Sequence, residues 1–471
     1  MDAKGIRPTR SACSLLSCGV LALACASQAA RAESLSFEAA QDRARGQAAS
    51  VRAGKALFDQ REEERAGWSG VGGPSVTLSG SVVKYSGPLS FDGMSRNSIA
   101  GSPDFSLTSF SANFNPLVPN WPPSDSGSGS KDYSQMQVNF IWPLFTGGAA
   151  RSWDAALGTR VVEAKADLAA HEQDLTQQVT QTYFKTQLAM QLLRLQEESL
   201  KALEARDQSV DVKTGATLNR AERLQLRMGI EAQRRALVRQ KAEADTQLDQ
   251  LGRLVRAQDV VQLSTPLFVI TEPLPTPSRY VSLAMLLNPS VAKLQAQRQQ
   301  AEHWQQLDAA ANKPSVIAFA QREVKRHDGA WVVGVAARWT LLDPLDRHAL
   351  ERASRWRLVQ VDQKAEQNRQ DVTLAIEKYW RDADAARRQY LSSQTAEELA
   401  AELAQLRAQE WAEGKGRARE VLDAESQLLK ARQERAQLAL DYVMALSQLL
   451  RLSGQSESLP EYLAQADIRL K

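Results

Sequence analysis

The sequence lacks several features that mark whole classes of protein. All three cysteines fall within residues 1–32, so a chain beginning after them has no disulfide and no thiolate metal site. No run of 18 apolar residues follows Glu33, so we expect no membrane-spanning helix after that residue. The formal net charge is only +3, and residues 1–32 account for all of it. The neutral remainder argues against a non-specific nucleic-acid binder, which needs a basic surface.

Catalytic and metal-binding patterns are also missing. The segment Gly127–Lys131 lacks the spacing and the strand–helix context of a phosphate-binding loop. There is no nucleophile elbow and no dinucleotide fingerprint. The four histidines are scattered without metal-ligand spacing: His171, His303, His327 and His348. We therefore expect no enzyme, no cofactor and no metal site.

The first 32 residues have the pattern of a secretory signal. Basic residues up to Arg10 precede a short apolar stretch over 13–26, and Ala30–Ala32 forms an A-x-A cleavage signal. This pattern predicts a mature chain that begins at Glu33. A lipid-modified Cys25 is the alternative, and its surrounding sequence fits the required box less well.

The rest of the chain contains an internal duplication. Ser50-Val51, followed by a proline at 74, recurs 240 residues later as Ser290-Val291, followed by a proline at 314. Gly215 recurs as Gly414, only 199 residues later. The shorter offset indicates an insertion in the first half. Residues 86–131 are rich in Ser, Gly, Pro and Asn, so we expect the insertion to be a loop there.

Long helices and short strands are both predicted. The runs 149–213 and 349–411 contain no proline, and about 65 helical residues would span roughly 100 Å. Near the C-terminus a seven-residue repeat is typical of a coiled-coil seam: Ala431, Leu438, Ala445 and Leu452. Alternating apolar residues predict strands, as over 136–142 and 331–341.

The strands fit two environments on pattern alone. Their length of about ten residues suits transmembrane β-strands, with Tyr85, Trp142, Trp331 and Trp339 as interface aromatics. An ordinary periplasmic hairpin packed on helices fits equally well. Four strands cannot close a barrel alone, so a membrane location would require several copies to pool their hairpins.

Two motifs resemble those of the TolC family of outer-membrane channel proteins. Phe140–Gly148 is similar to the family's strand that ends in P-L-F-x-G-G before a long helix. Gly414–Glu425 is similar to its turn motif G-x-x-x-x-x-D-V-L-x-A, and Pro74 and Pro314 match its strand-opening prolines. Together with the duplicated order of elements, the resemblance covers nearly all of the mature chain.

The resemblance implies a mainly α fold with a small transmembrane β part. Duplicated β-hairpins and long helical hairpins would assemble as a homotrimer with a 12-stranded β-barrel in the outer membrane and a periplasmic α-barrel. The implied segments are a signal peptide (1–32), a first periplasmic helix (33–73), a first β-hairpin (74–145, with the loop 86–131), a first helical hairpin (146–256), an equatorial linker and helix (257–313), a second β-hairpin (314–343), a second helical hairpin (344–454) and a C-terminal tail (455–471).

The resemblance also implies functional residues at the periplasmic tip. Glu420 and Asp423 match the family's acidic pair at the constriction, where three copies would favour cations. The alternative is that both carboxylates stabilise the positive end of the following helix. The other matched positions are tip turns and tip contacts: Gly215, Gly414, Gly416, Trp411, Arg417 and Arg419. Trp411 and Gly416 depart from the family's usual Tyr and Arg.

The function implied is a passive export duct in the cell outer membrane. Its partners would be a periplasmic adaptor protein, an inner-membrane transporter and outer-membrane lipid. The absence of a clear lipidation signal favours type I secretion of a polypeptide such as a toxin, driven by an ABC-type transporter. The outer component of a small-molecule or multidrug efflux pump is the alternative. A periplasmic coiled-coil scaffold without a pore is the hypothesis from another class.

Overall fold

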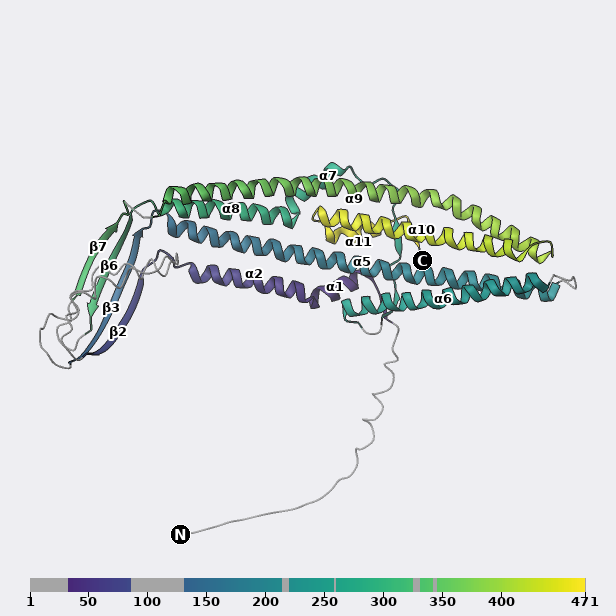
Figure 1. Cartoon of the computed structure of the whole chain (residues 1–471), viewed down its shortest axis with the longest axis horizontal. Helices are drawn as coiled ribbons and strands as arrows, with labels where there is room; N and C mark the ends of the chain where they lie inside the picture. Colours follow the sequence, from purple (N-terminus) through teal and green to yellow (C-terminus); the bar gives the residue numbers. More distant parts are fainter. Residues whose placement is uncertain are drawn as a thin grey trace, which may run out of the picture.

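The computed structural model describes residues 33–85, 131–213, 220–257, 260–324, 331–341 and 345–470. A small sheet lies at one end of a long body of helices that run side by side (Figure 1). The expected signal at 1–32, the loop between residues 86 and 130, and Gly215 lie outside the described residues. No described helix is both long and apolar enough to cross a membrane.

Two helices of exceptional length form the body. α5 has 65 residues and α9 has 66, about 100 Å each. α5 packs along α8, α6 and α2, and α9 packs along α10 and α8. The helix bounds are α1 Phe37–Gln47, α2 Ala49–Trp68, α5 Ala149–Lys213, α6 Arg220–Val255, α7 Pro277–Leu287, α8 Pro289–Ala310, α9 Arg347–Ala412, α10 Ala418–Leu452 and α11 Leu459–Ala464, with a 3-10 turn at Ser456–Ser458.

The order of elements is duplicated. In each half a helix is followed by two strands and then by two long helices: α2, β2, β3, α5, α6 and α8, β6, β7, α9, α10. The mainly α fold with few strands that the sequence predicts is confirmed. The single helix expected over 33–73 is instead divided into α1 and α2. Ala48 has extended backbone (φ −64°, ψ 123°), which ends one helix and begins the next.

The sheet joins the two halves. It comprises β2 (Ser75–Tyr85), β3 (Lys131–Phe145), β6 (Ser315–Glu323) and β7 (Trp331–Arg338), in the order β2-β3-β6-β7 with antiparallel neighbours. β2 and β7 are therefore its edges. Prolines precede β2 and β6, where the missing N–H costs no sheet hydrogen bond.

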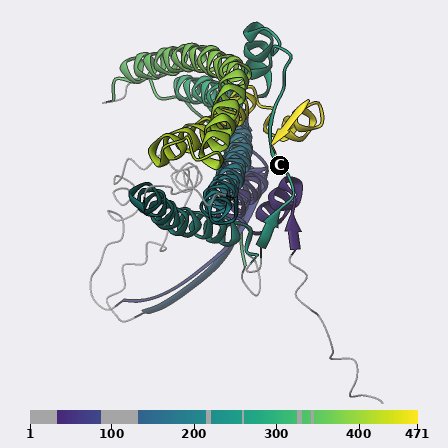
Figure 2. The same ribbon diagram turned by 90° about the vertical axis from the view of Figure 1, so that its right-hand side faces the viewer.

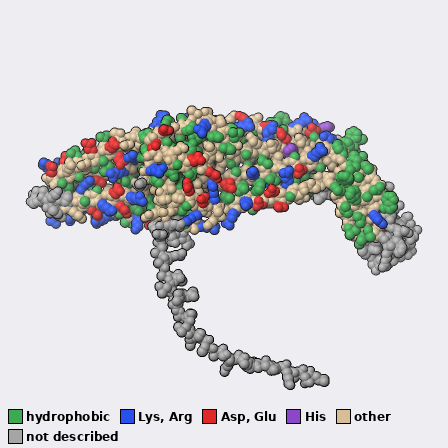
Figure 3. Space-filling model, turned by 180° about the vertical axis from the view of Figure 1, so that it is seen from behind, with side chains coloured by type: hydrophobic (Ala, Val, Ile, Leu, Met, Phe, Trp, Pro, Cys, Tyr) green, Lys and Arg blue, Asp and Glu red, His purple; other side chains and the backbone are tan. Residues whose placement is uncertain are grey.

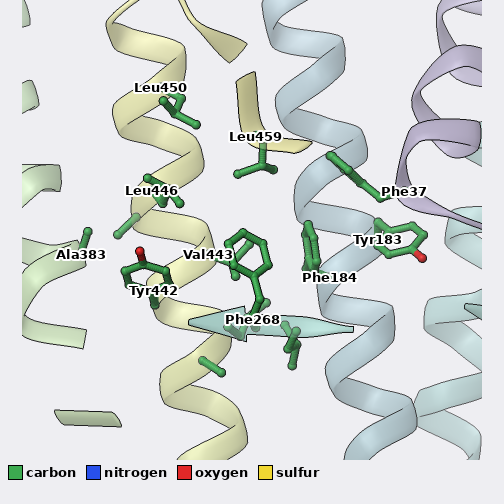
Figure 4. Packing of buried hydrophobic residues seen from close by; sticks show 14 of the residues in the cluster. Phe37, Tyr183, Phe184, Phe268, Ala383, Tyr442, Val443, Leu446, Leu450 and Leu459 are labelled. Atoms are coloured by element: carbon green, nitrogen blue, oxygen red, sulfur yellow. The ribbon is translucent and has the colours of Figure 1, made fainter. Parts of the chain in front are cut away.

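A hydrophobic core lies midway along the helical body. Aromatic rings of α1, α5, β5 (Leu267–Val269) and α10 contact one another there: Phe37, Tyr183, Phe184, Phe268 and Tyr442 (Figure 4). The Tyr183 hydroxyl donates to the Leu35 carbonyl (2.9 Å) and accepts from the Thr265 N–H (3.0 Å). This core joins α1, α5, β5 and α10 to one another at mid-length of the helical body.

Two small strand pairs hold the chain ends to this core. β1 (Glu33–Leu35) pairs in parallel with β4 (Val260–Leu263), and β8 (Ile468–Leu470) pairs with β5. The segment expected to be a tail thus contains α11 and β8. Likewise, the linker region 257–313 contains two helices, α7 and α8, as well as β4 and β5.

Candidate functional site at the tip and in the sheet

The tip of the second helical hairpin is a tight turn between α9 and α10. The N–H groups of Lys415 and Gly416 both donate to the Glu410 carbonyl, at 3.0 Å each. Gly414 has φ +77°, a conformation that favours glycine. A side chain at Gly416 would come within 2.9 Å of the Trp411 backbone nitrogen. Both glycines are therefore required by the local geometry.

Trp411 lies in a small hydrophobic cluster that joins the two helical hairpins. It is 1% exposed, although it lies at the far end of a narrow helical body. We call these residues the tip cluster: Leu200 and Leu203 of α5, Leu226 and Ile230 of α6, Trp411 of α9, and Ala418 and Val421 of α10. The first hairpin contributes four of its members. Burial of Trp411 therefore stabilises the hairpins in their mutual contact.

Two polar contacts reinforce the tip cluster. The Glu222 carboxylate of α6 accepts the N–H of Ala418 at 2.8 Å, in the first turn of α10. It therefore supplies the capping that the N-cap residue, Arg417, does not. Arg206 of α5 and Glu425 of α10 form an ion pair at 2.6 Å, with 18% and 6% of their side chains exposed. A buried pair of this kind is costly to break from one side only.

The two matched acids each have a basic neighbour. The Glu420 carboxylate lies 3.2 Å from Arg407, which also pairs with Glu410 at 2.7 Å. Asp423 lies 3.6 Å from Arg419 along α10, and both are largely exposed. The Glu410 and Glu420 carboxylates raise the pKa of Arg407 further above its usual range, chiefly through the Glu410 hydrogen bond. The structure thus places both acids at the tip, beside arginines.

Residues at the tip that the sequence analysis did not single out include Arg206 and Glu222 of the first hairpin and Arg407 of the second. Arg206 and Glu222 lie about 200 residues from their partners. No local pattern marks such pairs. The only available signal was their proximity to a predicted turn. Gly215 lies outside the described residues, so the first hairpin's turn stays a prediction.

The sheet exposes apolar side chains over its surface. Figure 3 shows hydrophobic side chains covering this end of the molecule, in contrast to the mixed charges on the helices. Trp331 and Trp339 lie eight residues apart and are 74% and 62% exposed. Trp142 is also exposed, near the helical end of β3. Tyr85 ends β2, but its side chain lies outside the part that the structure describes.

No metal site emerges from the described residues. No three His, Cys, Asp or Glu side chains lie close enough together there to hold an ion. The described residues thus form an exposed apolar sheet, long paired helices and a tip at which the two helical hairpins are joined.

Three bacterial outer-membrane proteins of known structure have closely similar architecture. The CmeC outer-membrane channel of Campylobacter jejuni superimposes with a TM-score of 0.70, 15% identity, and coverage of 91% of this chain and 88% of CmeC. The MtrE outer-membrane channel of Neisseria gonorrhoeae gives 0.69, 15%, and 89% of each chain. The outer-membrane protein VceC of Vibrio cholerae gives 0.71, 13%, and 89% and 96%.

The chain has the fold of an outer-membrane channel. The likeness extends over 89–91% of this chain and 88–96% of the other protein in each comparison. No protein-family model and no curated protein matches the sequence. At identities of 13–15% the likeness concerns the fold alone. The fold expected from the sequence resemblance is confirmed.

Proposed function

We propose that this protein is the outer-membrane channel of a three-part export system and acts as a passive duct. The observation that carries the proposal is the exposed apolar sheet at the end of helices about 100 Å long. Trp331 begins β7 and Trp339 follows its last residue, so the two lie about 26 Å apart along the strand direction, or about 20 Å in height at the usual strand tilt of 35–45°. Transmembrane strands carry an apolar band about 25 Å tall between aromatic girdles. The channel fold of the three similar proteins supports the same location.

The edges of the sheet support a trimer. β2 and β7 each have one neighbour among the described strands, so each presents an unpaired side. Unpaired strand edges are not tolerated in lipid. In a head-to-tail trimer, β7 of one copy pairs with β2 of the next. Three copies then pool twelve strands into a closed sheet.

The outer faces of α6 and α9 support the same head-to-tail contact. The two helices lie on opposite sides of the helical body (Figure 1). Exposed apolar residues occur on both: Leu224, Met228 and Val238 on α6, and Leu399 and Leu406 on α9. Residues 220–241 hold seven basic and two acidic residues, whereas 394–413 hold five acidic and one basic. Complementary faces on opposite sides of one subunit generate rings.

The tip cluster is proposed to keep the duct closed at rest. It joins the second hairpin to the first, and separation of the hairpins would widen the tip. The acids Glu420 and Asp423 would line the resulting constriction, with Arg417 and Arg419 moderating their charge. Docking of a periplasmic adaptor and an inner-membrane transporter would open it. These roles follow from the resemblance of the turn motif and from the contacts at the tip.

The cargo we propose is a polypeptide, delivered by an ABC-type transporter in type I secretion. The signal pattern without a clear lipidation box supports this choice over small-molecule efflux. The test is deletion of the gene and comparison of culture supernatants. Loss of one large secreted protein, restored by complementation, supports polypeptide export. An unchanged supernatant with increased drug susceptibility supports efflux instead.

Channel formation itself is tested on the purified protein. Detergent-extracted protein should form trimers and give discrete conductance steps in planar bilayers. A periplasmic scaffold would instead be removed from membranes by carbonate and conduct nothing. Arg235→Glu together with Arg239→Glu should weaken the trimer, because both exposed arginines lie on the basic face of α6. Lys55→Glu, an exposed charge reversal on α2, is the control.

A further inference from the structure

The first three turns of α9 have a composition unlike the rest of that helix. Residues 347–357 contain four arginines, one histidine and a single acid, Glu351. Large apolar side chains are exposed among them: Leu350 is 50% exposed and Trp356 is 72% exposed. A basic segment with an exposed tryptophan is typical of contact with a membrane surface.

Most of this positive charge remains accessible to solvent. Arg355 pairs with Glu351 at 2.7 Å and Arg352 approaches Asp346 at 3.7 Å, yet each arginine side chain is 62% exposed. Exposed pairs of this kind contribute little to stability and are readily exchanged. Arg347 donates to the Ala311 carbonyl, and Arg357 lies near Asp308 of α8. Even counting Asp346, positive charge exceeds negative charge in this part of α9.

The segment continues the apolar surface of the sheet. Beyond β7, exposed apolar residues lead from the sheet into α9: Trp339, Leu341, Leu345, Leu350 and Trp356. α9 begins eight residues after Trp339, at the junction with the sheet (Figure 1). In a view from the tip end, the start of α9 lies at the outer side of the helical body (Figure 2). Lys and Arg side chains also lie beside the apolar end of the molecule in Figure 3.

We propose that residues 347–356 bind anionic phospholipid headgroups of the leaflet that faces the helices. This inference depends on the proposed membrane location of the sheet. If the hydrocarbon ends near Trp339, Leu350 lies in the headgroup layer, which is roughly 6 Å thick. Arg352 and Arg355 lie about 8–12 Å from the start of α9, and their long side chains would extend toward the sheet end to reach the phosphates. Trp356 then marks the lower limit of the contact.

Site-specific labelling tests the position of the segment. Because residues 33–471 contain no cysteine, one introduced thiol can be labelled alone in the mature chain. We would label Leu350→Cys with bimane in nanodiscs of phosphatidylethanolamine and phosphatidylglycerol that contain headgroup spin-labelled lipid. Leu374→Cys is the control, since Leu374 is 64% exposed on the same helix and about 36 Å further along.

Strong quenching at position 350 and none at 374 is expected. An unquenched Leu350→Cys label in a conducting channel would overturn the proposal and indicate that a second copy covers this face or that it lines the duct. Failure of the proposed function is distinguishable, because the protein would then show no conductance and neither label would be quenched.

Lipid retention tests whether the arginines of this segment bind anionic lipid. Arg352→Gln with Arg355→Gln should lower phosphatidylglycerol retained in native mass spectrometry about tenfold, with phosphatidylethanolamine unchanged. Arg369→Gln with Arg381→Gln, exposed arginines further along α9, is the matched control and should retain the lipid. Equal losses in both double variants would also overturn the proposal, because they would show no preference for the first turns of α9.

Discussion

Replacement of Trp411 by alanine should favour the open tip. Removal of a buried tryptophan costs about 3–5 kcal/mol. Four of the six other members of the tip cluster belong to the first hairpin. We therefore assign about two-thirds of that cost, roughly 2–3 kcal/mol, to the contact between the hairpins. Since 1.4 kcal/mol is tenfold in an equilibrium constant, the variant should shift the closed–open equilibrium by about 30- to 150-fold.

The matched control is Trp411→Phe. Trp411 Nε1 has no hydrogen-bond partner among the described residues, so phenylalanine loses packing area but no polar contact. The alanine variant should therefore differ strongly from wild type, whereas the phenylalanine variant should differ little. This comparison separates closure by packing from closure by the indole N–H.

Two assays measure the opening. In planar bilayers, Trp411→Ala should spend more time in high-conductance states than wild type. In cells, it should increase susceptibility to a large antibiotic such as vancomycin, which does not cross an intact outer membrane. The reasoning is refuted if the alanine and phenylalanine variants, present in equal amounts as trimers, show the same conductance and the same susceptibility.

Three further predictions concern the tip and the chain start. Glu420→Gln with Asp423→Asn should reduce the cation preference of single channels, and unchanged reversal potentials in a salt gradient would exclude a role in selectivity. Arg206→Leu should loosen the tip by about 3–5 kcal/mol because Glu425 is left buried and unpaired, and adding Glu425→Leu should restore most of it in hydrogen-exchange measurements. Intact mass of the mature protein should place its first residue at Glu33, the first residue of β1; a mass that includes any of residues 1–32 would contradict this.

The elements predicted from sequence are those with strong local signals. α5 and α9 were predictable because long proline-free runs of helix-forming residues have few other structures open to them. The strands were predictable from alternation and from their opening prolines. The break at Ala48 was not, since alanine is a strong helix former and its identity does not indicate the extended backbone found there.

The candidate site divides in the same way. The turn at Gly414 was identified from its glycines and the following motif, because the required backbone conformation restricts the residue type. The contact between Glu222 and Ala418 was not predictable, because it joins residues 196 positions apart in different hairpins. The arginine partner of Glu420 was equally hidden, since Arg407 lies on the preceding helix, across the turn.

The two unpaired edges of the sheet have a genetic consequence. If β7 of each copy must pair with β2 of the next, one defective edge leaves the whole ring open. A proline within β2 removes a backbone donor from that edge and should make the variant dominant over the normal protein. With equal expression and random mixing, about one trimer in eight would contain only intact subunits. A variant copy expressed beside the normal gene would then leave most of the trimers open-edged and remove most of the export that we propose for this channel.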